Sequence, residues 1–170
     1  MKNPVKVDLP YPDISDLQPD AYSAQLIAPS YAGQNGELTA ILQYQYHGYY
    51  LDCDKEVLDL LQSIALCEME HFEVLGQTLL KLGVPPTFTN YPPYKFSPYN
   101  TSSVGYSCQI HKILLDDITG ETLAIAEYER VLSKLTNEKV GAVISRILLD
   151  ERLHVNALKE QLERLSSHTY

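Results

Sequence analysis

The sequence lacks the features that mark several common classes of protein. No tryptophan occurs among its 170 residues, and no apolar run approaches the length of a bilayer span. Only 13 Lys and Arg residues stand against 22 Asp and Glu, for a formal net charge of −9. Because no basic stripe is present to displace counterions from phosphates, the composition argues against nucleic-acid binding. The absence of a long apolar run argues against insertion into a membrane.

Cysteine is also scarce. Cys53, Cys67 and Cys108 are an odd number and form no Cys-x-x-Cys pair, which argues against a disulfide framework, a zinc ribbon and a rubredoxin-type iron site. The first residues (MKNPVKVD) contain no long apolar segment, so we expect no signal peptide and a location in the reducing cytoplasm.

The length and the 45% hydrophobic content suit one globular domain. Residues 1–30 are rich in Pro and Asp and are expected to form an extended N-terminal arm, and residues 31–168 the domain itself. Helical periodicity marks a segment that ends near residue 51, with a start blurred by Pro29, Gly33 and Gly36. Three further helical segments follow, at about residues 54–83, 103–135 and 137–166.

The connections between these segments predict the topology. Short turns at 52–53 and near 136 give two antiparallel helical hairpins. Residues 84–102 hold five prolines and several tyrosines, so they cannot be helical and suit a long crossover between the hairpins. The prediction is an all-α fold, a four-helix bundle with the ferritin-like connection.

Two Glu-x-x-His pairs lie at the centres of apolar helix stripes. Glu68 and His71 share the face of the second segment that carries its apolar residues, and Glu151 and His154 do the same on the fourth. Burying an ionised carboxylate costs several kcal/mol unless a counter-charge is present. The pattern therefore predicts bound metal ions.

Two further glutamates match these pairs in face and depth. Glu37 lies on the apolar face of the first segment and Glu121 on that of the third. All four glutamates lie roughly fifteen residues from the turn of their own hairpin, which places them at one level, roughly 22 Å from that turn. Four unrelated glutamates would seldom agree in both respects.

A Glu from each of two helices and Glu-x-x-His from the other two is the ligand set of ferritin-like dimetal proteins. Mixed oxygen and imidazole donors suit Mn or Fe, and the sequence does not choose between them. Glu68 and Glu151 are the candidate bridges, although spacing does not decide which carboxylates bridge. The predicted ligands of the two metal ions are Glu37, Glu68, His71, Glu121, Glu151 and His154.

Four other residues lie near these ligands, and no catalytic residue beyond the ligands is predicted. Asp117 or Asp150 could orient a ligand histidine through its ring N–H. Tyr44 and Tyr128 each follow a predicted ligand by two helical turns, as core tyrosines or as redox relays.

The segment from Tyr31 to Ala40 (YAGQNGELTA) resembles the start of the first ligand helix in manganese catalases and their spore-coat relatives. The Glu37–Glu68, Glu68–His71 and Glu121–His154 intervals are similar to the ligand spacing of that family. The resemblance covers about residues 30–166, and the ligand motifs are shared by the wider superfamily. It implies a dimetal oxidoreductase that disproportionates hydrogen peroxide, and it adds a spore-associated location as an alternative to the cytoplasm.

The chain departs from both resembled families. It is shorter than a full manganese catalase and has no second domain, and it lacks the rubredoxin module of rubrerythrins. One turn before Glu121 it has Asp117 and Ile118, where rubrerythrins carry an extra glutamate. The departures from rubrerythrins favour the catalase-type site over the rubrerythrin type.

Other functions stay open at this point. The rivals are a ferritin- or rubrerythrin-like protein that oxidises and stores iron with dioxygen or peroxide, a structural coat component, and a peroxidase supplied by a separate reductase. Apolar residues on the outer helix faces also predict a homo-oligomer, at least a dimer. These residues are Leu42, Tyr46, Tyr49, Tyr50, Leu149 and Leu153.

Overall fold

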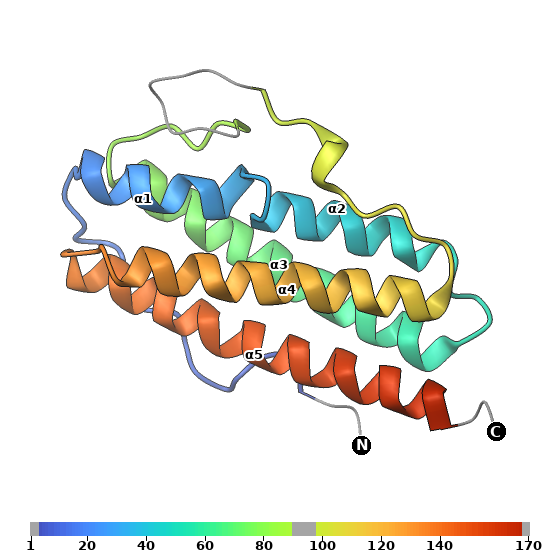
Figure 1. Ribbon diagram of the computed structural model, residues 1–170. Coiled ribbons are helices and arrows are strands. Elements are labelled where there is room, and N and C mark those ends of the chain that lie inside the picture. The colour runs from blue at the N-terminus through green and yellow to red at the C-terminus, as the bar shows by residue number, and fades with distance from the viewer. Residues whose placement is uncertain (1–3, 90–97, 168–170) are drawn as a thin grey trace.

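The computed structural model describes residues 4–89 and 98–167. Within these ranges the chain is helical and contains no strand. Figure 1 shows α1 and α2 following one another along one edge, so that the helices form four rods and confirm the predicted ferritin-like bundle. The elements are α1 (Ala21–Ala32), α2 (Glu37–Gly48), α3 (Lys55–Lys81), the 3-10 helix η1 (Thr101–Ser103), α4 (Ile110–Leu132) and α5 (Glu138–Ser167).

Both predicted hairpins are present. The chain turns between α2 and α3, where Asp54 caps α3 by accepting a 3.1 Å hydrogen bond from the Val57 N–H. It turns again between α4 and α5, where the Asn137 side chain accepts from the Val140 N–H at 3.2 Å. The crossover lies between Lys81 and Ile110, and its central residues 90–97 fall outside the described ranges.

The predicted arm is too long, because α1 begins at Ala21 and the extended arm ends at residue 20. Asp20 caps α1 through the Ser23 N–H. The Pro- and Asp-rich composition hid this helix. Pro29 lies in its last turn, and the chain then breaks at Gly33, whose N–H donates to the Pro29 carbonyl at 2.8 Å.

Glycine is required at the break between α1 and α2. A Cβ atom at Gly33 would lie 2.4 Å from the Pro29 carbonyl oxygen, and one at Gly36 would lie 2.6 Å from the same atom. This tight packing starts α2 at Glu37, which fixes the position of that carboxylate along the bundle.

Helix α4, the third of the four predicted helical segments, also begins later than predicted, at Ile110 instead of near residue 103. The preceding segment is held against α2, since the Gly105 N–H donates to Gln43 Oε1 at 2.7 Å. This contact is between segments far apart in the sequence, so the periodicity of the local sequence could not predict it.

The apolar core has two parts with a polar layer between them. One cluster contains Leu75 and Ile144, and the other contains Leu61 and Leu158. Glu68 lies between Leu61 and Leu75 along α3, and Glu151 lies between Ile144 and Leu158 along α5. The predicted ligands therefore occupy the middle of the bundle. None of the described helices is long and apolar enough to cross a membrane.

The residues on which the association prediction rests are partly exposed. Tyr49 and Tyr50 at the end of α2 are 69% and 45% exposed, and Leu149 on α5 is 37% exposed. Leu42, Tyr46 and Leu153 are half-buried. Association between copies of the chain stays a prediction, which sedimentation at micromolar concentration tests.

Candidate metal centre

The structure brings together all six side chains predicted to bind metal. Glu37 comes from α2, Glu121 from α4, and the two Glu-x-x-His pairs from α3 and α5; each residue is at most 4% exposed. They fall into two groups of four whose ligand atoms lie within 4.8 Å of one another. The first group is Glu37, Glu68, His71 and Glu151, and the second is Glu68, Glu121, Glu151 and His154.

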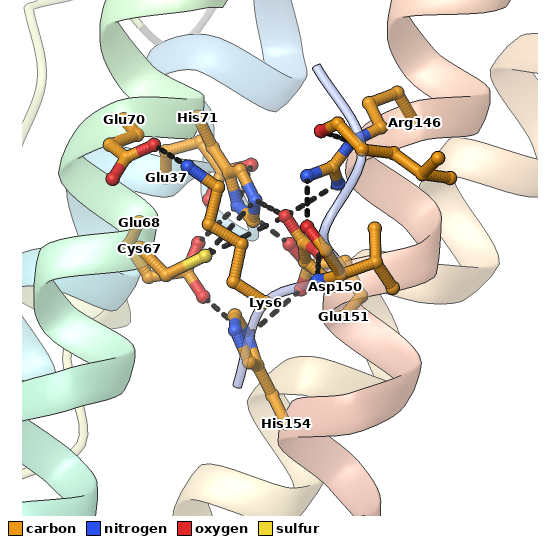
Figure 2. A network of polar contacts seen from close by, with 12 residues as sticks. Lys6, Glu37, Cys67, Glu68, Glu70, His71, Arg146, Asp150, Glu151 and His154 are labelled. Atoms are coloured by element: carbon orange, nitrogen blue, oxygen red, sulfur yellow. Dashed lines mark hydrogen bonds and ion pairs between the residues drawn. The ribbon is translucent and has the colours of Figure 1, made fainter. Parts of the chain in front are cut away.

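Each histidine points its Nδ1 atom into the centre. His71 Nδ1 lies 3.0 Å from both Glu68 Oε2 and Glu151 Oε1, and 3.9 Å from Glu37 Oε1. His154 Nδ1 lies 2.8 Å from Glu68 Oε1 and 3.4 Å from Glu121 Oε2. Figure 2 shows the two Glu-x-x-His pairs facing each other across the bundle.

Charge and hydrogen bonding both fit a pair of divalent cations. Four buried carboxylates would carry four negative charges, and two histidines supply at most two positive ones. Several inward atoms also accept or donate no hydrogen bond: Glu68 Oε1, Glu151 Oε1 and both ring nitrogens of His154. Glu151 Oε1 is unbonded even though His71 Nδ1 is close, so a short distance here is not a satisfied contact. Metal ions among these atoms would neutralise the excess negative charge and would bind the atoms that lack a hydrogen bond.

Without metal, four of the six predicted ligands have raised pKa values. Burial and the charge of Glu68 raise the pKa of Glu37 and of Glu151 well above the usual range of a carboxyl. Burial opposes ionisation of Glu68 too, but His154 and His71 outweigh it and hold its pKa well below that range. Burial likewise opposes charge on the two histidines, and Glu68 outweighs it, so that their pKa values are raised. Metal binding would release these protons.

Tyr44 and Tyr128 contact the centre directly. The Tyr44 hydroxyl donates to Glu121, and the Tyr128 hydroxyl donates to Glu37. Burial, reinforced by the neighbouring carboxylates, raises the pKa of both phenols well above the ordinary value, so each is a neutral donor. Both are core residues, as one interpretation of the sequence held. They also hold Glu121 and Glu37, the two outer carboxylates of the centre, which belong to one group of ligands each. A role as redox relays stays a prediction.

Asp150 contacts a predicted ligand, as the sequence suggested. Its Oδ2 lies 3.2 Å from His71 Nε2 and 2.7 Å from Arg146 Nη1, and its Oδ1 accepts from the Val7 N–H at 2.8 Å. Burial opposes its ionisation, but these three partners lower its pKa. A carboxylate on the outer ring nitrogen fixes the orientation and tautomer of an imidazole, leaving Nδ1 free to face the centre.

Asp117 has a different partner, and the prediction that it orients a ligand histidine is wrong. Its Oδ1 lies 2.8 Å from His47 Nδ1 and accepts from Gln43 Nε2 at 2.8 Å. Asp117 faces α2 from α4, whereas His71 and His154 lie on α3 and α5. Burial raises its pKa, and His47 and Gln43 oppose that shift.

Sequence reasoning missed two residues beside the centre. Cys67 Sγ lies 3.5 Å from His71 Nε2 and 3.7 Å from Asp150 Oδ2. Cys67 precedes Glu68 as Asp150 precedes Glu151, and that shared register was the available signal. Arg146, four residues before Asp150 on α5, forms an Arg–Asp pair that helix spacing could have revealed.

A pocket of about 310 Å³ lies between α2, α4 and the segment before α4. Its inner end is lined by Glu37, Glu121 and Glu151, and its outer end by the exposed residues Asn35 and Thr119. The centre is thus open toward the exterior on one side.

Sequence comparison identifies the family of the chain. The family model "Manganese containing catalase" matches residues 8–92, half of the chain. The chain belongs to the manganese-catalase family. A relative described as a probable manganese catalase from Clostridium acetobutylicum is 24% identical over 165 residues, covering 85% of this chain and 72% of that protein.

Solved structures agree on the fold of this family member. KatB, a manganese catalase from Anabaena, superposes with a TM-score of 0.83 at 21% identity, covering 96% of this chain and 81% of that one. A dodecameric thioferritin from Bacteroides fragilis superposes with a TM-score of 0.71 at 17% identity, covering 89% of this chain and 90% of that one. At such identities the likeness concerns the fold alone.

Proposed function

We propose that this manganese-catalase family member is a dimetal oxidoreductase that disproportionates hydrogen peroxide to water and dioxygen. One observation carries the proposal: six buried carboxylate and imidazole side chains from four rods meet in two overlapping groups that share Glu68 and Glu151. Shared carboxylates are what two adjacent metal ions require as bridges.

Each metal site would have its own histidine and outer carboxylate. His71 and Glu37 would serve one ion, His154 and Glu121 the other, and Glu68 and Glu151 both. When bound, the two ions would supply the two electrons that each peroxide molecule takes up or gives back. Mn is preferred on family membership, although the donor set also accepts Fe.

The surrounding residues would hold these ligands in position. Tyr44 and Tyr128 keep neutral hydroxyl donors on the two outer carboxylates, and Asp150 fixes the ring of His71. The pocket between α2 and α4 would admit peroxide to the side of the centre that Glu37, Glu121 and Glu151 line.

The proposal is tested on protein purified from its own host. We expect close to two Mn ions per chain and oxygen release from peroxide without added reductant. Glu68→Ala and Glu151→Ala should lose metal and activity together. Glu129→Ala removes a carboxylate that is 54% exposed and should change neither. Unchanged metal content in Glu68→Ala would overturn the assignment.

The same centre supports one alternative, the oxidation of Fe(II) with storage of the ferric product, because its carboxylate and imidazole donors also accept iron. That function predicts stoichiometric Fe(II) oxidation and a retained ferric mineral in a large shell. Turnover of peroxide with no retained mineral would exclude it.

A further inference from the structure

The pocket between α2 and α4 is larger than hydrogen peroxide requires. A water molecule occupies about 30 Å³ of liquid, so hydrogen peroxide with its two oxygens needs roughly twice that volume. The pocket offers about 310 Å³. Volumes of roughly 300 Å³ and more are typical of sites for organic ligands. Room therefore remains beside the peroxide group for an organic substituent.

The walls of the pocket suit such a substituent. Its lining includes the apolar residues Ala40, Val104, Leu123 and Ala124 together with the carboxylates of the centre. Asp117 also lines the pocket, with Oδ2 buried and free of hydrogen bonds. Carboxylates at this density repel an anion, so the fitting molecule is small, uncharged and polar at one end.

Gly120 keeps the pocket wide. It lies on α4 directly before Glu121 and lines the pocket. A Cβ atom built there would meet nothing closer than Gln43 Nε2 at 3.6 Å, an ordinary contact distance. A larger side chain at this position would therefore be accommodated by the backbone and would occupy space in the pocket.

We propose that the pocket admits small uncharged organic hydroperoxides and that the centre reduces them; this rests on the function proposed above. The O–O bond of ROOH breaks, two protons and two electrons are taken up, and ROH and water form. When bound, the two metal ions would supply the electrons. Hydrogen peroxide would restore them as it is oxidised to dioxygen with loss of two protons. The sum is ROOH + H₂O₂ → ROH + H₂O + O₂.

The experiment uses tert-butyl hydroperoxide with hydrogen peroxide on the metal-loaded protein, and follows tert-butanol by NMR. Wild-type protein should form tert-butanol. Gly120→Leu should lower kcat/KM for tert-butyl hydroperoxide by about tenfold or more, and should lower that for hydrogen peroxide by a much smaller factor, because the smaller molecule still fits beside the leucine. Gly141→Leu is the matched control, a helical glycine with nothing within 4 Å of its added Cβ, and should change neither.

Binding supplies a readout that does not depend on turnover. Saturation-transfer NMR on the metal-free protein should detect tert-butanol bound to wild type and to Gly141→Leu, and not to Gly120→Leu. Ala124→Leu fills the same wall and should act as Gly120→Leu does, which guards against a folding defect in one variant.

The outcomes separate the two proposals. Turnover of hydrogen peroxide without any tert-butanol formation would overturn the organic hydroperoxide proposal alone. Equal turnover of tert-butyl hydroperoxide by wild type and Gly120→Leu would also overturn it, since the pocket would not be the route. No turnover of either peroxide by wild type would overturn the catalase proposal and this one with it.

Discussion

The hydroxyl of Tyr44 on α2 donates a hydrogen bond to Glu121 on α4. Seven residues after Glu121, Tyr128 on α4 returns the same contact to Glu37 on α2, seven residues before Tyr44. Each outer carboxylate of the centre is thus held by the phenol that follows the other one. The two hairpins are joined at the centre by a reciprocal pair of contacts, one for each proposed metal site.

This reciprocity predicts separable effects on the two sites. Tyr44→Phe should weaken metal binding at the site of Glu121 and His154, and Tyr128→Phe at the site of Glu37 and His71. Loss of a hydrogen bond to a charged group costs about 1.5–3 kcal/mol, or roughly tenfold to a hundredfold in affinity. Stepwise Mn titration followed by electron paramagnetic resonance measures the two steps.

Tyr46→Phe provides the control for these variants, because the Tyr46 hydroxyl donates to Tyr50 away from the centre. It should leave both binding steps unchanged. Equal weakening of both steps by either tyrosine variant would contradict the pairing of one phenol with one site.

The two aspartates beside the centre should behave differently. Asp150→Asn replaces the carboxylate that contacts His71 Nε2, and loss of such a partner lowers metal affinity by about 10–100-fold. Asp117→Asn disturbs the pairing with His47 and should reduce thermal stability while metal affinity stays within about twofold. Calorimetric titration with Mn(II) and melting of the metal-free protein measure the two effects. A large loss of affinity in Asp117→Asn would refute the distinction.

The metal-free protein should lose stability as the pH rises. The folded state raises the pKa of Glu37 and Glu151 above 4.5, and of His71 and His154 above 6.5. A raised pKa stabilises the fold below the unfolded value, and that stability is lost as the pH rises through the folded value. Each extra proton held by the folded state contributes a slope of about 1.4 kcal/mol per pH unit.

Glu68 acts in the opposite sense at the acid end. Its lowered pKa adds stability above pH 4.5 that is lost as the pH falls toward the folded value. The melting temperature of the metal-free protein should therefore be highest in mildly acidic solution and fall toward pH 9. Added Mn(II) should raise it most at the alkaline end, because metal competes with the protons. A metal-free melting temperature that rises from pH 6 to pH 9 would contradict this.

The ligands could be predicted because the evidence for them is local. Helix periodicity gives the face of Glu68 and Glu151, and the distance to each turn gives their depth. The face and the depth of each ligand do not depend on the conformation of the loops. The start of α1 could not be predicted in the same way, since Pro29 and the two close-packed glycines obscure a helix whose stability comes from burial of residues such as Ile27 against the bundle.

The surroundings of the ligands depend on packing between helices. Asp117 and Asp150 each lie within one turn of a predicted ligand on their own helix. Periodicity alone therefore does not show which of them contacts a ligand histidine. The rotation of α4 against α2 turns Asp117 to His47, whereas α5 turns Asp150 to His71. The pocket beside Gly120 is a volume left between elements, and no spacing in the sequence measures it.

The N-terminal arm is fastened next to the centre by two buried side chains, Asp150, which accepts from the Val7 N–H, and Arg146. Arg146 donates from Nε to the Leu9 carbonyl at 2.8 Å and from Nη2 to the Val7 carbonyl at 3.0 Å, and its guanidinium lies 4.7 Å from the centre of the Tyr11 ring. Its Nη1 lies 2.7 Å from Asp150, so the same residue joins the arm to the carboxylate that holds His71.

Arg146→Met should therefore free the arm and disturb His71 together. Removing one partner of a buried ion pair costs about 3–5 kcal/mol, and two carbonyls of the arm also lose their donor. Limited proteolysis should cut within residues 4–20 faster than in wild type, and Mn(II) affinity should fall. Arg152→Met, on the same helix but 54% exposed, should change neither. Faster proteolysis with unchanged affinity would mean that Asp150 orients His71 without help from Arg146.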